Sequence, residues 1–186
     1  MELCSRGSLY HVLKEDKTIA LTWYFIVFPA NLYFFRDRFF SFSFDILYGI
    51  KTLHSWNPQI LHRDIKTLNY LVNKDYVVKV CDFGLSRFNT SQNMQTMNKI
   101  VGTVNYLAPE VYTGETYTEK SDVYSLSIVL WEIIARWLNK RYCSPYEEFG
   151  FRFDWQILVA ISQNNQRPTF PEKTPEKLKK AVQQAM

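Results

Sequence analysis

The sequence predicts an α+β fold that is mainly helical and carries short β-hairpins. Three observations predict it: a helical apolar pattern over 37–55, an almost uniformly apolar run over 121–138, and two β-rich runs, 70–72 and 77–80, around a polar turn. The chain has 186 residues, of which 47% are hydrophobic and 22% are charged. This size and composition suit one domain with a real core.

The first two helices are predicted from their apolar spacing. A short helix begins at Gly7-Ser8 and ends in the charged cluster 14–17. A second helix fits 37–55, where apolar residues recur at spacings of three and four and therefore form a stripe that faces the core. That stripe consists of Phe39, Phe42, Ile46, Ile50 and Leu53.

The middle of the chain predicts a hairpin and a buried helix. Runs 70–72 and 77–80 flank Asn73-Lys74-Asp75-Tyr76, a polar hairpin turn. The run 121–138 is apolar on nearly every side, which predicts a helix buried all round, with Ser121 as its N-cap.

The last helix is predicted from its start signals. Thr174 is expected at the N-cap and Pro175 at the first helical position. One face then aligns Leu178, Val182 and Met186, and we expect that a partner surface for this face is missing.

Composition excludes several classes of protein. The glycines lie too far apart for a phosphate-binding glycine loop, and a net charge of +4 gives no reason to expect a nucleic-acid partner. Cys4, Cys81 and Cys143 are odd in number and form no C-x-x-C pair, so neither a disulfide framework nor a zinc site is expected. The N-terminus is charged where a signal peptide would be apolar, so a reducing, cytoplasmic location is expected.

Three segments carry the chemistry. They are ILHRDIKTLNYLV over 60–72, VVKVCDFGLS over 77–86 and GTVNYLAPE over 102–110. With these segments the sequence resembles the eukaryotic protein kinases, whose H-R-D-x-x-x-x-N, D-F-G and A-P-E signatures are all present in order. The resemblance implies a protein kinase-like fold, and specifically its mainly helical large (C-terminal) lobe.

The resemblance implies a site that moves a phosphoryl group from ATP with the help of Mg²⁺. Asp64 is expected to accept or orient the proton of the accepting hydroxyl, and Lys66 to lie against the γ-phosphate. Asn69 and Asp82 offer the hard oxygen ligands that Mg²⁺ prefers. Lys66 together with Thr103 favours serine or threonine as the acceptor on a protein substrate.

The start of the chain, MELCSRGSLYHVL, resembles the hinge of the tyrosine-kinase-like group, which includes Raf-type serine/threonine kinases. On this alignment the backbone of Glu2 and Cys4 binds adenine, and Leu71 forms an apolar floor beneath it. Cys81 is expected to be a small buried residue.

The resemblance also implies supporting residues. His62 is expected to pack as a structural residue of the loop, and Asp122 to hydrogen-bond the backbone of the catalytic loop. Arg63 would grip a phosphorylated segment, which implies an upstream kinase that acts on the 86–103 loop. The candidate acceptors there are Ser86, Thr90, Ser91, Thr96 and Thr103.

The pattern departs from the family at both ends. Residues 1–186 are expected to be a partial kinase domain, from the hinge to the helix after the substrate lobe, with the small lobe missing. The glycine-rich loop, the β3 lysine and the αC glutamate would then be absent, so impaired activity is expected of the chain alone. Glu110 is expected to lack the arginine with which the family pairs it.

Residues 24–36 are expected to be an insertion, because the family pattern runs without interruption when they are removed. They overlap the uncharged stretch 18–35, but a membrane span there would separate the hinge from Asp64, so none is expected. Unremoved intron sequence and a species-specific insertion both remain open.

Two functions from different classes follow. The first is a serine/threonine protein kinase of the tyrosine-kinase-like group that acts in signal transduction. The alternative is a catalytically inactive docking or scaffold module. The four residues of the phosphate site weigh against the alternative, since docking does not require them, and truncation weighs for it.

Overall fold

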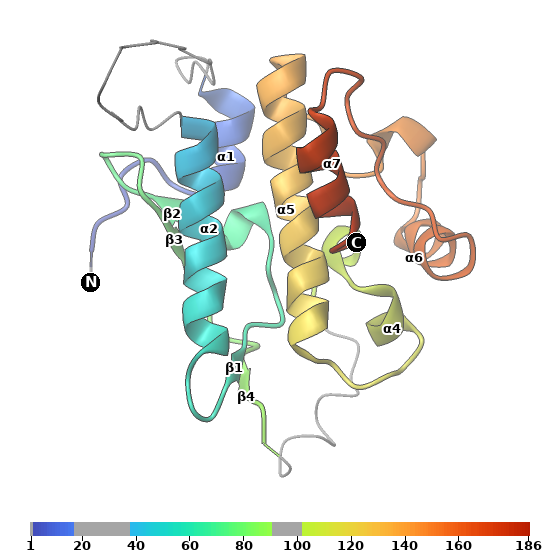
Figure 1. Ribbon diagram of the computed structural model, residues 1–186, viewed down its shortest axis with the longest axis horizontal. Coiled ribbons are helices and arrows are strands. Elements are labelled where there is room, and N and C mark those ends of the chain that lie inside the picture. The colour runs from blue at the N-terminus through green and yellow to red at the C-terminus, as the bar shows by residue number, and fades with distance from the viewer. Residues whose placement is uncertain (1, 17–37, 91–101) are drawn as a thin grey trace.

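The computed structural model describes residues 2–16, 38–90 and 102–186 (Figure 1). Seven-residue α1 is followed by the long helix α2, two small strand pairs, the long helix α5 and the shorter helices α6 and α7. The bounds are α1 Leu9–Glu15, α2 Arg38–His54, β1 Ile60–Leu61, η1 Thr67–Asn69, β2 Tyr70–Val72, β3 Val78–Val80, β4 Arg87–Phe88, η3 Val104–Tyr106, α4 Pro109–Tyr112, α5 Glu119–Asn139, η4 Glu147–Phe149, α6 Asp154–Gln163 and α7 Glu176–Gln183.

Helices α2 and α5 lie side by side and enclose the centre of the core (Figure 1). The apolar stripe predicted for α2 is confirmed, because all five of its residues are buried. Phe39 stacks on Trp137 of α5 with ring centroids 4.6 Å apart. Helix α5 is buried on nearly every side, as predicted, and the surrounding elements therefore pack against it.

The predicted N-cap of α5 was wrong. The helix begins at Glu119 and Thr118 is its N-cap, with the Thr118 hydroxyl accepting from the amide of Lys120 at 3.2 Å. Ser121 lies in the first turn, where its hydroxyl accepts from the Thr118 amide at 3.3 Å and donates to Glu110 at 2.7 Å. A serine three residues inside the helix closes a capping box instead of starting the helix.

The predicted hairpin is confirmed with a strand that starts one residue later. Antiparallel β2 and β3 pair Tyr70 with Val80 and Val72 with Val78. Val77 stays outside the ladder because its amide donates to the side-chain oxygen of Asn73 at 3.0 Å. Strands β1 and β4 form a second antiparallel pair, which the sequence analysis did not predict.

Helix α1 begins as predicted, with Ser8 as N-cap and its hydroxyl accepting from the His11 amide. Helix α7 begins at Glu176 with Pro175 as N-cap, so the predicted cap was wrong by one residue. The Thr174 residue lies outside the helix, and its hydroxyl donates to the carbonyl of Pro171 at 2.6 Å.

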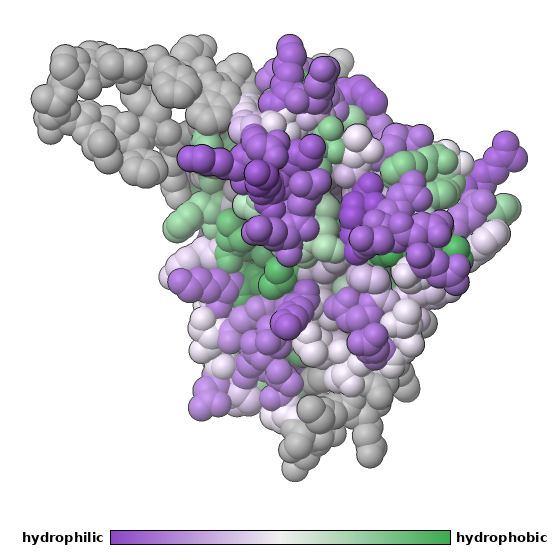
Figure 2. All heavy atoms as spheres, turned by 45° about the vertical axis from the view of Figure 1, so that its right-hand side comes forward, coloured by the Kyte–Doolittle hydropathy of each residue, from purple (hydrophilic) through white to green (hydrophobic). Residues whose placement is uncertain are grey.

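The apolar face of α7 is only partly uncovered. Val182 is buried against α5, and Leu178 and Met186 pack on the same core, so α5 supplies most of the partner surface that was expected to be missing. An apolar groove of about 340 Å³ remains between α2, α5 and α7. Figure 2 shows hydrophobic side chains gathered between hydrophilic ones on this side of the molecule.

The expected insertion at 24–36 and the uncharged stretch 18–35 lie outside the described residues. Within the described ranges, no helix has both the length and the apolar character that crossing a membrane requires.

Candidate active site

Asp64 is the centre of a cluster drawn from two distant segments. Its Oδ2 accepts from Lys66 Nζ at 2.7 Å and from Asn69 Nδ2 at 2.8 Å. Thr103, more than thirty residues along the chain, donates to Asp64 Oδ1 at 3.4 Å and accepts from Lys66 Nζ at 3.0 Å. The structure therefore brings Asp64, Lys66 and Asn69 together with Thr103.

The loop reaches this geometry through a single turn of 3-10 helix. The Asn69 amide donates to the Lys66 carbonyl at 2.9 Å, which curls the chain so that the Asn69 side chain returns to Asp64. Asn69 Nδ2 also donates to the Asp64 carbonyl at 2.8 Å. Because Oδ2 of Asp64 already has two close donors and Oδ1 has one long contact, Oδ1 has the greater capacity to accept a further proton donor.

Asp82 follows the strand that pairs with this loop. The amide of Cys81 donates to the Asn69 carbonyl at 2.9 Å, so Asp82 leaves the hairpin directly beside Asn69. Asp82 is exposed, has a φ of 62° and accepts from the Gly84 amide at 3.2 Å through Oδ1. The two hydrogen bonds found for the Asn69 side chain use Nδ2, which leaves its amide oxygen to act as a ligand. Amide and carboxylate oxygens are the types of ligand that Mg²⁺ prefers.

The residues expected to hold adenine lie along the other edge of the hairpin. The Gly7 carbonyl accepts from the Val72 amide at 2.9 Å, so the N-terminal segment runs beside β2 with half-buried Leu71 opposite Ser8. The carboxylate of Glu2 contacts Lys79 and accepts from Asn73 at 3.0 Å, and these contacts lower the pKa of Glu2.

Cys81 lies between the end of β3 and Asp82. Burial raises the pKa of the Cys81 thiol, and the nearby Asp82 and Cys4 raise it further. Cys81 is half-buried, so it is less enclosed than the small buried residue that was expected, and its raised pKa is that of an unreactive thiol.

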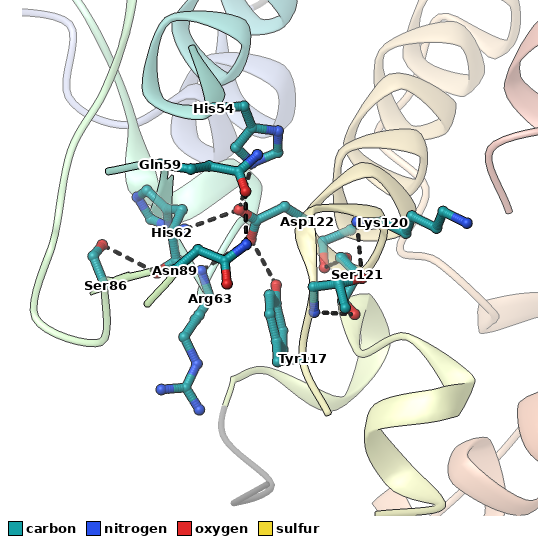
Figure 3. A network of polar contacts seen from close by, with 12 residues as sticks. His54, Gln59, His62, Arg63, Ser86, Asn89, Tyr117, Lys120, Ser121 and Asp122 are labelled. Carbon is teal, nitrogen blue, oxygen red and sulfur yellow. Dashed lines mark hydrogen bonds and ion pairs between the residues drawn. The ribbon is translucent and has the colours of Figure 1, made fainter. Parts of the chain in front are cut away.

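The backbone of the catalytic loop is held by Asp122, as the sequence predicted (Figure 3). Asp122 is fully buried and accepts from the amides of His62 at 2.9 Å and Arg63 at 3.0 Å. It also accepts from the Tyr117 hydroxyl at 2.6 Å and from His54 Nε2 at 2.8 Å. Both carboxylate oxygens are therefore fully used within the protein.

His62 is a buried structural residue. Its Nδ1 accepts from the Asp64 amide at 3.3 Å, and its Nε2 lies 3.0 Å from the Cys81 carbonyl, to which it donates. One accepting and one donating nitrogen define a neutral ring. His62 thus links the catalytic loop to the end of β3, and this geometry agrees with the packing role expected for it.

Arg63 lies next to the segment that the sequence analysis named as a regulatory loop. It is buried with a φ of 70°, and its guanidinium lies 5.5 Å from the centre of the Tyr117 ring. Burial lowers the pKa of Arg63, and the positive charge of Arg87 nearby lowers it further. Of the candidate acceptors, Ser86 donates to the His62 carbonyl at 3.1 Å, and two lie outside the described residues, namely Ser91 and Thr96.

Glu110 is half-buried and has a neutral partner. Its carboxylate accepts from the Ser121 hydroxyl at 2.7 Å, so the first turn of α5 supplies a hydrogen bond where the sequence analysis expected an uncompensated carboxylate.

No group of three or more histidine, cysteine, aspartate or glutamate side chains within the described ranges could hold a metal, and the candidate magnesium pair contains an asparagine.

The sequence analysis missed a second buried carboxylate, Glu132 on α5. It accepts from the hydroxyls of Tyr142 at 2.7 Å, Tyr106 at 2.8 Å and Thr67 at 3.3 Å. Burial raises the pKa of Glu132 to about 7, and the three hydrogen bonds act in the opposite direction. An acidic residue inside an otherwise apolar run was the signal that could have identified it.

Comparison with known proteins places this arrangement in a family. A probable serine/threonine-protein kinase of Dictyostelium discoideum is 47% identical over 183 residues, which cover 98% of this chain and 17% of the relative. Stress-activated protein kinase alpha of the same organism is 45% identical over 98% of this chain and 27% of its own length. A probable tyrosine-protein kinase is 36% identical over the whole chain and 52% of the relative.

The chain thus spans less than a third of the first two relatives. The family model described as "Protein tyrosine and serine/threonine kinase" matches residues 1–186, the same span that carries the Asp64 cluster and the Asp122 network. The chain belongs to the protein tyrosine and serine/threonine kinase family, and its fold is the helical large lobe of that domain.

Proposed function

We propose that this domain transfers the γ-phosphate of ATP to serine or threonine hydroxyls of a protein substrate. The observation that carries the proposal is the position of Lys66, whose ammonium group donates to both Asp64 and Thr103. A cation between a carboxylate and a hydroxyl suits a step in which an alcohol must be aimed at a phosphate and negative charge must be neutralised. Relatives named as probable serine/threonine-protein kinases favour the same acceptor class.

Each side chain then has a distinct role. Oδ1 of Asp64 accepts the proton of the incoming hydroxyl, since Oδ2 is held by Lys66 and Asn69. Lys66 neutralises charge on the transferred phosphate, and Thr103 fixes the distance between the catalytic loop and the substrate side of the site. A magnesium ion held by Asn69 and Asp82 supplies charge neutralisation at the phosphates when it is bound.

Adenine is proposed to bind against the N-terminal segment. The backbone of Glu2 and Cys4 offers hydrogen bonds to its edge, and Leu71 offers an apolar floor. The half-buried position of Leu71 on β2 and the hydrogen-bonded approach of the segment to Val72 support this placement. We further propose a cytoplasmic location, and regulation by an upstream kinase that acts between 86 and 103 opposite Arg63.

Nucleotide binding is tested by thermal unfolding of the 186-residue chain with and without ATP and MgCl₂. Ligand at 100 times its Kd stabilises a protein by about 2.7 kcal/mol, and about 2–4 °C per kcal/mol is typical at this size. We therefore expect a rise in Tm of about 5–10 °C that requires Mg²⁺ and is lost in Asp82→Asn. Asp75→Asn is the matched control, because Asp75 is an exposed aspartate at the opposite end of the same hairpin.

Transfer is tested with labelled ATP, a general protein substrate and analysis of the labelled amino acids. The chain and the protein translated from its complete transcript are both assayed. Phosphoserine or phosphothreonine is expected, and Asp64→Asn should abolish both. Phosphotyrosine alone would overturn the acceptor class. A Tm that ignores MgATP, together with no transfer by either protein, would overturn the enzyme and favour the docking module.

A further inference from the structure

The buried carboxylate of Glu132 contacts both halves of the transfer site through two neutral hydroxyls. Oε1 accepts from Thr67, which directly follows Lys66 in the catalytic loop. Oε2 accepts from Tyr106, which closes the 3-10 turn that begins directly after Thr103. The two hydroxyls are also 3.1 Å from each other. The side chain of Glu132 therefore links the catalytic loop, at Thr67, to the segment that follows Thr103, at Tyr106.

We propose that Glu132 is a positioning residue: by holding Thr67 and Tyr106 it sets the separation at which Lys66 bridges Asp64 and Thr103. This inference rests on the proposed phosphoryl transfer. Glu132 itself is completely buried, so it touches neither nucleotide nor substrate and acts only through these partners. Because α5 is buried along most of its length, Glu132 holds the two segments against the packed core.

The protonation state of Glu132 decides the direction of these hydrogen bonds. The groups that face it are Thr67 from η1, Tyr106 from η3 and Tyr142 from the segment after α5, and none carries a charge at neutral pH. The ionised carboxylate accepts from all three. A protonated carboxyl must donate one bond, and Tyr106 can receive it while its own hydroxyl turns to Thr67. Because burial raises the pKa of Glu132 to about 7, this reversal of the hydrogen bond with Tyr106 occurs close to neutral pH.

Glu132→Gln is the informative substitution at the carboxylate. Its amide can donate to Tyr106 and accept from Thr67 and Tyr142, so every hydroxyl keeps a partner while the titration disappears. We expect the pH profile of kcat in the wild type to show a step near pH 7 that is absent in Glu132→Gln. A step of the same size and position in both proteins would overturn the proposal.

Tyr106→Phe and Tyr142→Phe form a matched pair, because each removes one hydroxyl that donates to Glu132 and only Tyr106 also contacts the catalytic loop. Losing a buried hydrogen bond of a network that positions the transfer site lowers a rate constant about tenfold. We expect Tyr106→Phe to lower kcat about tenfold with the KM for ATP unchanged. Tyr142→Phe should keep kcat within about twofold on the high-pH plateau and move the pH step upward, since that hydrogen bond lowers the pKa of Glu132.

Hydrogen exchange measured by mass spectrometry separates this inference from the proposed function, because it does not require transfer. Backbone amides of 64–69 and 103–107 should exchange faster in Tyr106→Phe than in the wild type, and at the wild-type rate in Tyr142→Phe. Equal acceleration in both variants, or in neither, would overturn the positioning role. If the selective effect occurs but no protein transfers phosphate, the link between the segments stands and the proposed function fails.

Discussion

Replacing Asp122 by alanine should unfold the catalytic loop more readily than any other single change on α5. The substitution leaves four donors without their acceptor, and two of these are the backbone amides of His62 and Arg63, which cannot rotate toward water. Each buried donor left unpaired costs about 1–3 kcal/mol, so the two amides alone imply a loss of about 4 kcal/mol. The hydroxyl of Tyr117 and the imidazole of His54 have more freedom to find water, and we assign them no cost.

Such a loss is a large part of the 5–15 kcal/mol that typically stabilises a domain. Asp122→Asn should cost about half as much, because the remaining oxygen still accepts while the new amide group faces donors. Urea unfolding followed by tryptophan fluorescence measures both, since Trp131 and Trp137 of the same helix are buried. Ser127→Ala is the control: Ser127 is buried on α5 but donates only to the nearby Tyr124 carbonyl. A loss below about 1 kcal/mol in Asp122→Ala, or a loss equal to that of Ser127→Ala, would refute the reasoning.

Three further predictions concern stability. The pKa of Glu132 is about 7 in the native state, against an ordinary value of 4.5. Between pH 4.5 and pH 7 the native state therefore holds a proton that the unfolded state has lost. The contribution of Glu132 to stability falls as pH rises through this window. At 1.36 kcal/mol per pKa unit, Glu132→Gln should gain about 3 kcal/mol relative to the wild type between pH 4.5 and 8 in urea unfolding, and parallel curves would contradict this. On α2, Phe42→Ala should cost about 3–5 kcal/mol because Phe42 is fully buried. Phe44→Ala should cost less than about 1 kcal/mol because Phe44 is 62% exposed. Equal losses in urea unfolding would show that the buried face of α2 is assigned wrongly. Thr118→Ala should remove the cap of α5 and cost about 1 kcal/mol by the same measurement, and a loss no larger than that of an exposed control such as Thr169→Ala would exclude the cap.

Local patterns in the sequence predicted the elements that local physics determines. The stripe of α2 follows from spacing alone, because residues three and four positions apart lie on one face of a helix. The hairpin follows from two β-rich runs around a polar turn. The errors at helix starts, Ser121 for Thr118 and Thr174 for Pro175, arose where neighbouring residues of capping type follow one another and the local pattern does not distinguish between them.

Pairings between distant segments could not be predicted in this way. Strand β1 is two residues long, and its partner β4 lies 26 residues further on, so neither has a pattern long enough to detect. The same holds for Glu132, whose three partners come from three separate segments. A buried acid in an apolar run indicates that partners exist, but only the fold identifies them.

The distribution of these contacts explains why the motif residues were recognisable while their supports were not. Asp64, Lys66 and Asn69 lie within six residues and contact each other through one turn, so their chemistry is contained in a short stretch of sequence. Their placement relative to Thr103 is not local, because Thr103 lies more than thirty residues along the chain and two carboxylates of α5 contact the loop. Asp122 fixes the loop backbone at its start and Glu132 fixes it at Thr67, so one buried helix restrains the catalytic loop at both ends. A lobe built this way can lose a side chain at the transfer site and keep its fold, whereas a change at Asp122 should impair both.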